Sequence, residues 1–321
     1  MDKKELRVEL PDKQRIDTYM RDQTALSRGQ IQKLVETARV FLNKKPVKAY
    51  SQMVRQGDLI EYIEEFPEEK LPEHNDIPLD IIYEDEDILV INKQAGLVVH
   101  PAPGHKDGTL VNAIMDTHID PDDFEGDEKR FGVVHRLDKD TSGVMVIAKH
   151  DRASDALVRM FKARELEKNY KAIVHGSIEN EGRIDTFISR DTHDRKKFTA
   201  KLMHGKEAQT LFYPEENFYD STLLRVKILT GRTHQIRVHM QHIKHNIAGD
   251  PVYGDRKKDI AMTEYMGYDA KSVEDLLPRQ MLHAYNLKFT HPITDKKLDF
   301  TAPLPDDFMR ALKILRKKSG V

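Results

Sequence analysis

Apolar residues recur at helical spacing in two short stretches near the start of the chain. The apolar positions of Gln14–Met20 fall on one face of a helix. A second helix is predicted over Arg28–Thr37, because Ser27 is a favourable N-cap before an apolar stripe. Short strands are predicted at Val40–Leu42 and Gly57–Ile63, on either side of turn-forming residues. Two helices followed by a small antiparallel sheet indicate a compact module.

The hydrophobic pattern divides the chain into three parts. The small module takes up residues 12–65. Residues 66–78 contain three prolines and many acidic side chains without periodic apolar positions, which is typical of a linker. Residues 79–321 are long enough for one large domain.

Strand-like and helix-like stretches follow one another irregularly in the large domain. Ile81–Tyr83 and Ile88–Asn92 flank a polar turn and predict a hairpin. The other predicted elements are helices over residues 110–115, 151–161 and 306–317 and strands over residues 170–175 and 222–229. This pattern predicts an α+β fold with a mixed, mostly antiparallel sheet and peripheral helices.

Composition narrows the class of protein. The 321 residues include no cysteine, which excludes disulfides and thiolate chemistry and fits a reducing cytoplasm. We expect neither a signal peptide nor a membrane span, since no apolar stretch is long enough. The net charge is only −2, but ten basic and six acidic side chains lie between Lys13 and Glu64. The excess of positive charge is therefore local to the small module.

One segment of the large domain carries most of the chemical information. His135–Gly143 reads His-Arg-Leu-Asp-Lys-Asp-Thr-Ser-Gly, between strand-like runs at Phe131–Val134 and Val144–Ala148. Hydroxyls and a glycine after Asp138 can fix a tight loop around its carboxylate. An isolated aspartate in a turn is more often a backbone cap than a catalytic group, so the segment alone leaves both roles open.

The whole stretch Phe131–Lys149 resembles the catalytic motif of RluA-type pseudouridine synthases, in which the aspartate is essential. Three further stretches match that family in the same order: Leu229–His239, Gly249–Gly254 and Leu282–Ala284. One match alone would be weak, whereas four ordered matches are hard to obtain by chance. The resemblance implies a synthase domain with a mixed, mostly antiparallel sheet, and an isomerase that acts on RNA.

The implied reaction makes modest chemical demands. Conversion of uridine to pseudouridine breaks the N1–C1′ bond and joins C5 to C1′, with nothing added or lost, so we expect no cofactor. An ionised carboxylate can stabilise or trap an electron-poor ribose, or add to the ring. We assign that role to Asp138. Attack at C1′, attack at C6 and removal of a ribose proton remain open routes.

The resemblance also implies partners for Asp138. Arg237 is expected to hold the carboxylate ionised and oriented. Tyr170 is expected to stack on the uracil and to help move the C5 proton, and Ile236 to supply an apolar wall. Arg136 is expected to fill the space left by a flipped nucleotide, or otherwise to contact a phosphate.

The small module resembles the alpha-L RNA-binding domain, first described in ribosomal protein four of the small subunit. The match runs from Ser27 to Asp58, with departures at Ala38 and Lys44, where the family usually has glycine. Basic residues of the second helix and the following loop are expected to bind RNA phosphates. These are Arg28, Lys33, Arg39, Lys44 and Lys45.

Closely spaced histidines raise the question of a metal. His234, His239, His242 and His245 lie in one segment, but neither cysteine nor an established zinc pattern accompanies them. We therefore expect no metal.

The sequence favours a monomeric, cytoplasmic pseudouridine synthase without membrane attachment, acting on large-subunit (23S) ribosomal RNA or pre-ribosomal particles. Three alternatives stay open. The substrate could be transfer RNA, the chain could be a non-catalytic RNA-binding factor in ribosome assembly, or it could be a metal-dependent hydrolase. A chelator would inhibit only the hydrolase, and loss of the Asp138 carboxylate would spare only the assembly factor.

Overall fold

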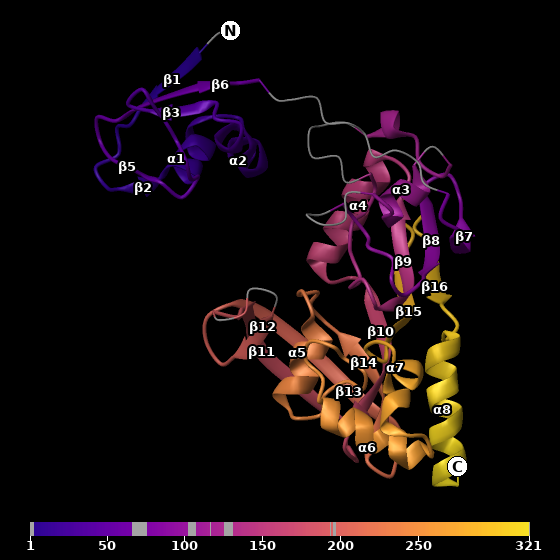
Figure 1. Cartoon of the computed structure of the whole chain (residues 1–321). Helices are drawn as coiled ribbons and strands as arrows, with labels where there is room; N and C mark the ends of the chain where they lie inside the picture. The colour runs from indigo at the N-terminus through magenta and orange to yellow at the C-terminus, as the bar shows by residue number, and fades with distance from the viewer. Residues whose placement is uncertain are drawn as a thin grey trace. The chain divides into compact units, whose positions relative to one another are not determined.

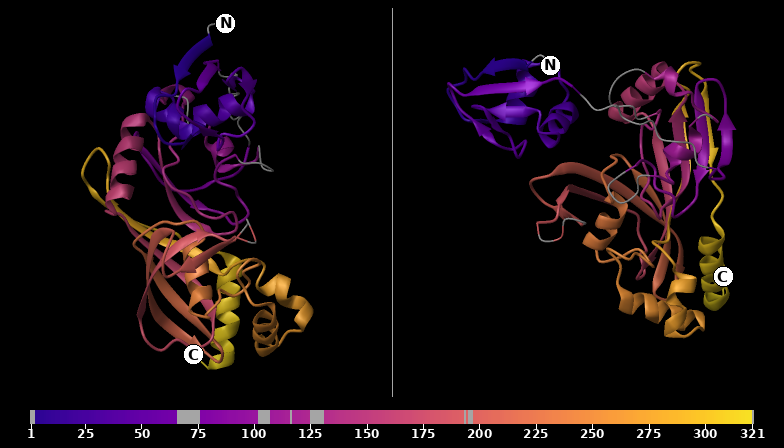
Figure 2. Two further views of the ribbon diagram at one scale, coloured as in Figure 1. Left: turned by 90° about the vertical axis from the view of Figure 1, so that its left-hand side faces the viewer. Right: turned by 45° about the horizontal axis from the view of Figure 1, so that its top comes forward.

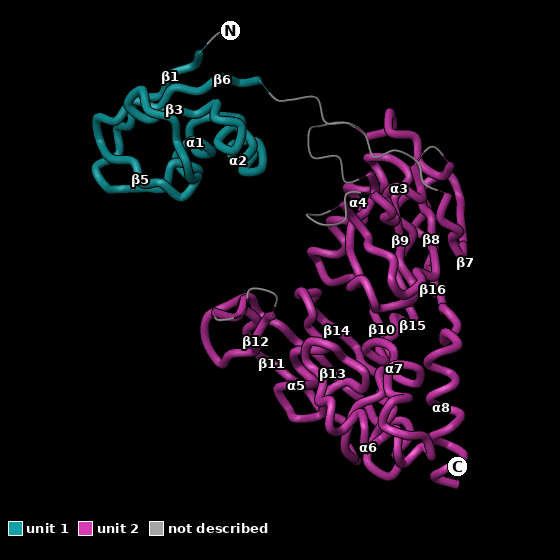
Figure 3. Tube along the Cα trace, viewed as in Figure 1, with its two compact units in different colours: residues 1–71 teal, residues 72–321 magenta. Residues whose placement is uncertain are grey.

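The computed structural model describes residues 3–65, 76–101, 107–115, 117–124, 131–192, 194 and 197–320. The chain forms two compact units, residues 1–71 and residues 72–321 (Figure 3). Each unit is considered by itself. The predicted linker, residues 66–78, lies outside the described residues except for 76–78.

The described residues of the small unit form two helices and two small sheets (Figure 1). Its elements are β1 (Lys3–Arg7), β2 (Gln14–Arg15), α1 (Ile16–Gln23), α2 (Arg28–Glu36), β3 (Val40–Leu42), β4 (Lys45–Pro46), β5 (Met53–Val54) and β6 (Leu59–Ile63). Four strands pair antiparallel in the order β1-β6-β3-β4, and β2 pairs with β5. Both predicted helices are confirmed, although the first begins at Ile16, after a short strand.

Local hydrogen bonds explain why the small unit turns where it does. Ser27 and Gln30 form a capping box that starts α2, as the N-cap prediction requires. The two departures from the usual glycines keep the turn geometry, since Ala38 and Lys44 have φ values of 55° and 66°. Asn43 fixes the second turn by donating to Asp58 over 2.8 Å. Left-handed backbone at alanine and lysine is tolerated here at a small cost in stability.

The large unit is built on a ten-stranded sheet. Its strands are β7 (Asp80–Glu84), β8 (Ile88–Lys93), β9 (Ser142–Ala148), β10 (Glu167–His175), β11 (Gly182–Arg190), β12 (Phe198–Lys201), β13 (Lys206–Phe218), β14 (Ser221–Ile228), β15 (Leu282–Thr290) and β16 (Lys297–Thr301). Nine follow the order β12-β11-β13-β14-β10-β15-β9-β8-β7, and β16 pairs with β15. Only β9 and β15 run parallel among the described strand pairs, so the α+β prediction is confirmed.

Helices cover the sheet at its ends and faces (Figures 1 and 2). They are α3 (Leu110–Ile114), α4 (Asp151–Ala163), α5 (Gln235–His242), α6 (Arg256–Met266), α7 (Val273–Leu276) and α8 (Asp306–Ser319), with 3-10 turns at Pro121–Asp123 and Ala270–Ser272. All seven residues of β9 are buried, and α4 packs against this strand. No helix among the described residues is long and apolar enough to cross a membrane.

One predicted strand is wrong. Phe131–Val134 forms a turn, because Phe131 and Gly132 have φ values of 45° and 71°. The Gly132 carbonyl accepts a hydrogen bond from Ala148 at the end of β9, and a Cβ on Gly132 would lie 1.8 Å from the Ala148 oxygen. A glycine is therefore required where the chain turns into the Asp138 loop.

Candidate active site

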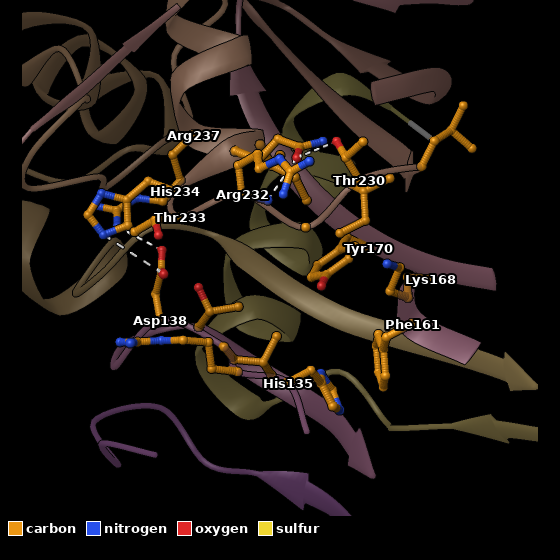
Figure 4. Close-up of a pocket in the computed structure, with 18 of the residues that line it drawn as sticks. His135, Asp138, Phe161, Lys168, Tyr170, Thr230, Arg232, Thr233, His234 and Arg237 are labelled. Carbon is orange, nitrogen blue, oxygen red and sulfur yellow. Dashed lines mark hydrogen bonds and ion pairs between the residues drawn. The ribbon is translucent and has the colours of Figure 1, made fainter. Parts of the chain in front are cut away.

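A cavity of about 600 Å³ opens beside the loop that carries Asp138 (Figure 4). It is bounded by residues 134–141, the second half of α4, the start of β10 and residues 228–237. The Asp138 side chain is 22% exposed, which leaves its carboxylate accessible from the cavity. Segments far apart in the sequence thus meet at one carboxylate.

Two buried basic side chains hold the part of the loop that follows Asp138. Lys93 donates to three backbone carbonyl oxygens, including that of Lys139 at 3.0 Å. Arg279 donates to the carbonyl of Asp140 over 3.0 Å. Burial lowers the pKa of Lys93 to about 7, although the negative charge of Asp140 opposes this shift. The backbone that follows Asp138 is therefore fixed by side chains from outside the motif.

Arg237, on α5, contacts the carboxylate as expected. Its Nη1 donates to Oδ2 of Asp138 over 2.9 Å. Its Nε and Nη2 donate to the two oxygens of Asp250 over 2.6 and 2.8 Å. Burial alone would lower the pKa of Arg237, but hydrogen bonding to Asp250 and the charges of both carboxylates raise it. A permanently charged guanidinium therefore lies against Asp138.

Asp250 lies in the matched stretch Gly249–Gly254, from which no contact to Arg237 was expected. Asp250 Oδ1 also accepts from the amides of Val252 and Tyr253 over 2.8 and 2.9 Å. The turn thus aims a buried carboxylate at the arginine. Only the ordered resemblance of the two segments gave a signal for this contact, since neither segment predicts it alone.

Tyr170 and Ile236 both line the cavity and are buried. Tyr170 lies on β10, and its hydroxyl shares the cavity with Asp138 (Figure 4). Burial and the charge of Asp138 raise the pKa of Tyr170. Its hydroxyl therefore keeps its proton at neutral pH in the absence of substrate.

Similarity to known proteins identifies the family of the chain. Residues 87–242 match the family described as RNA pseudouridylate synthase, and residues 14–60 match the S4 domain. The uncharacterized RNA pseudouridine synthase YlyB of Bacillus subtilis is 41% identical over 306 residues, which are 95% of each chain. The chain belongs to the RluA family of RNA pseudouridine synthases. It is therefore an isomerase that acts on RNA, with an N-terminal RNA-binding domain.

Two further relatives bear on substrate and fold. The ribosomal large subunit pseudouridine synthase D of Yersinia pestis is 40% identical over 296 residues, covering 90% of this chain and 87% of that protein. The solved structure of human RNA pseudouridylate synthase domain containing 4 is 25% identical with a TM-score of 0.57, covering 74% of this synthase and 93% of that chain.

The rest of the synthase cavity is basic and aromatic. Arg136 is exposed and lines the cavity. Lys168, which the sequence analysis missed, lies with its Nζ 5.5 Å from the ring centre of Phe161. The ring of His135 stacks on the ring of Phe161, with the two ring centres 4.8 Å apart. Burial lowers the pKa of His135 to about 3. A neutral stacked histidine and two basic side chains thus line the cavity.

One of the crowded histidines, His239, is held by hydroxyl groups on both sides of its ring. His239 binds Thr210 and Thr186 through its two ring nitrogens over 2.8 and 2.9 Å. Within the described ranges, one group has metal-ligand spacing: Asp85, Asp87 and His291. Nδ1 of His291 accepts from the amides of residues 293 and 294, so its Nε2 carries a hydrogen and donates to Asp85 over 3.0 Å. These hydrogen bonds are those of a structural turn.

The basic residues expected to bind RNA sit on the small unit as predicted. Arg28 and Lys44 are exposed, whereas Lys33 and Arg39 are half-buried. Arg28 lies 3.4 Å from the buried carboxylate of Asp17. Arg39 lies 3.4 Å from Glu65, so both arginines are paired with carboxylates in the absence of RNA.

Proposed function

We propose that this synthase converts specific uridines of large-subunit ribosomal RNA to pseudouridine, with Asp138 as the catalytic carboxylate. The observation that carries the catalytic part is the Asp138–Arg237 ion pair at a cavity large enough for a nucleotide base and its ribose. The observation that favours ribosomal RNA is the 40% identity, over most of both chains, to a ribosomal large subunit synthase.

Each expected site residue has a role consistent with its place. Arg237 donates a charged hydrogen bond to Asp138 and orients its carboxylate while a positively polarised ribose forms beside it. Ile236 offers an apolar surface to the base. Tyr170 presents a ring for stacking and a protonated hydroxyl, which exchanges a proton only when the reacting uracil changes its surroundings. The three routes for Asp138 remain open.

The charges around the cavity match an RNA substrate. Among the described residues that line it, one carboxylate, Asp138, faces several cations: Arg136, Lys162, Arg164, Lys168, Arg232 and Arg237. A second cavity of about 310 Å³ shares Gly231, Arg232 and Thr233 with the first and is also lined by Arg190 and Lys206. A basic path beside the active site supports binding of the phosphates that flank the target uridine.

Cytoplasmic location and action as a monomer belong to the same proposal. Bacterial ribosomal relatives and the RNA-binding domain support the cytoplasm. Sedimentation of the purified protein tests the oligomeric state.

A comparative pseudouridine map tests the target. Ribosomal and transfer RNA are sequenced from cells with the protein, without it, and complemented with Asp138→Asn. We expect sites in large-subunit ribosomal RNA to vanish in the last two strains. Loss confined to transfer RNA would overturn the ribosomal assignment. Rescue of ribosome assembly by Asp138→Asn, with no change in pseudouridine, would favour the assembly factor.

A further inference from the structure

A second side chain, His234, approaches Asp138 from the start of α5, the helix that carries Arg237. Nε2 of His234 lies 3.9 Å from Oδ1 of Asp138, while Arg237 contacts Oδ2. Figure 4 shows the His234 ring beside the carboxylate, with both interactions drawn. His234 is the residue just before α5 begins, and its backbone is left-handed, with a φ of 55°. The family resemblance assigned His234 no role, and only its crowding with other histidines drew attention to it.

The far nitrogen of the ring is fixed by a chain of hydrogen bonds. The amide of Phe198 donates to the hydroxyl oxygen of Tyr253 over 2.8 Å. That same oxygen lies 2.8 Å from Nδ1 of His234. Tyr253 is 1% exposed, so its hydroxyl hydrogen has no access to water.

Two independent arguments place the ring hydrogen of His234 on Nε2. The buried Tyr253 hydroxyl already accepts from Phe198, and it can use its own hydrogen only by donating to Nδ1 of His234. The opposite tautomer would also turn the lone pair of Nε2 toward the Asp138 carboxylate, which repels it. Both arguments give a neutral imidazole whose Nε2–H points at Asp138.

The charges around the ring agree with a neutral form. Burial lowers the pKa of His234 from its ordinary value, against the opposing effect of Asp138. The other charged groups that face the ring are Arg237, Asp250 and Arg136. The neutral tautomer is therefore the form present at physiological pH.

We infer that His234 is a positioning residue for the proposed reaction, holding the second oxygen of Asp138 through Nε2–H. The Phe198–Tyr253 chain sets its tautomer. The 3.9 Å separation shortens to a hydrogen bond when substrate fills the cavity, as catalytic hydrogen bonds commonly do. With both oxygens held, the carboxylate presents a fixed orientation to the ribose.

Two substitutions separate this role from a structural one. In His234→Gln the side-chain amide nitrogen reaches the place of Nε2 and can still donate to Asp138. In His234→Asn the amide ends near the place of Nδ1 and cannot reach Asp138. Asparagine tolerates the left-handed backbone better than glutamine, so a purely structural role predicts the reverse order of damage.

The inference rests on the proposed function, and the experiment distinguishes the two. Single-turnover rates are measured with ribosomal RNA from cells that lack the protein. We expect His234→Gln to stay within about threefold of the wild type and His234→Asn to be slower by about 10- to 100-fold at unchanged RNA affinity. Equal rates for His234→Asn and the wild type, or equal losses in both variants, would overturn the inference.

A second measurement needs no substrate. The ring-nitrogen NMR shifts of His234 in the full-length protein should report the Nε2–H tautomer at neutral pH, and Tyr253→Phe should weaken that preference. An Nδ1–H tautomer in the wild type would overturn the inference. If the wild type itself forms no pseudouridine in any RNA, the proposed function fails. The NMR shifts still determine the tautomer of His234 in that case.

Discussion

Asp250 binds Arg237, the arginine that contacts Asp138. Its two oxygens accept hydrogen bonds from Nε and Nη2 of Arg237, which leaves Nη1 for Asp138. Asp250→Asn removes the charge of a buried partner, so the free energy of unfolding should fall by about 3 kcal/mol. Turnover should fall about 10-fold or more as the guanidinium shifts. Urea unfolding and single-turnover rates check both effects.

A matched control for Asp250→Asn is Asp185→Asn. Asp185 pairs with Arg183 on the exposed face of β11. This control should change neither turnover nor RNA affinity. A wild-type rate in Asp250→Asn would show that Arg237 does not depend on its second carboxylate.

Arg237→Lys tests the guanidinium itself. A lysine has one compact ammonium and cannot bind Asp138 and Asp250 together in this geometry. We expect turnover to fall by about 100-fold or more while RNA affinity stays within a few-fold. Arg225→Lys, at a partly exposed arginine 3.8 Å from Glu215, serves as the control. Near-normal single-turnover rates in Arg237→Lys would remove this residue from the mechanism.

Tyr170→Phe separates stacking from proton transfer. The ring remains on β10 at the cavity, but the hydroxyl whose pKa is raised by burial and Asp138 is lost. RNA affinity should be unchanged, and the chemical step should slow by about 100-fold or more. Tyr170→Ala should weaken binding as well. A phenylalanine variant as fast as the wild type would leave Tyr170 with stacking alone.

The small unit should contribute salt-dependent affinity. Lys44 and Lys45 are exposed beside the turn at Asn43. Removing both charges should lower the slope of log affinity against log salt by about 0.7–0.9 per lost phosphate contact. The single-turnover rate at saturating protein should not change. Lys288→Ala, at an exposed ion pair with Asp299, is the control, and an equal loss of slope there would contradict a specific contact.

Buried neutral histidines should make the protein sensitive to mild acid. Burial lowers the pKa of His135 to about 3 and those of His239 and His283 to about 4. The unfolded chain takes up protons near pH 6.5 while the folded protein does not, so stability is full above about pH 6.5. It should fall as the pH drops from there toward 4, by up to about 1.4 kcal/mol per pH unit for each histidine.

Urea unfolding at several pH values checks the acid sensitivity. The His283→Gln variant should lose part of the slope below pH 6.5. A flat stability profile between pH 6.5 and 4.5 would show that these histidines are protonated in the folded state.

Several helices and hairpins could be predicted because neighbouring residues in the sequence determine where they begin and turn. Ser27 and its apolar stripe gave α2, and the polar turn after Tyr83 gave the β7–β8 hairpin. The strands β11 to β13 were not predicted. Buried Ile184 and Ile188 of β11 do alternate with exposed residues, but the order in which these strands pair is set by tertiary contacts. The turn at Phe131 was mistaken for a strand because its positive φ is imposed by the close approach of Ala148.

Some residues of the candidate site could be predicted from the sequence and others could not. Asp138 and Arg237 are 99 residues apart, and only the ordered family motifs gave their pairing. The role of Asp250 and the orientation of His234 depend on how α5 faces the following turn, which no local pattern encodes. Long-range hydrogen bonds between buried polar groups are set by the whole fold.

Asp138 itself is tested most directly with purified protein and ribosomal RNA labelled with tritium at uridine C5. Formation of the new C5–C1′ bond releases that tritium. The wild-type protein should release it in amounts stoichiometric with pseudouridine, and Asp138→Asn should release none while binding the RNA with wild-type affinity. Release by Asp138→Asn at the wild-type rate would contradict the assignment of this carboxylate.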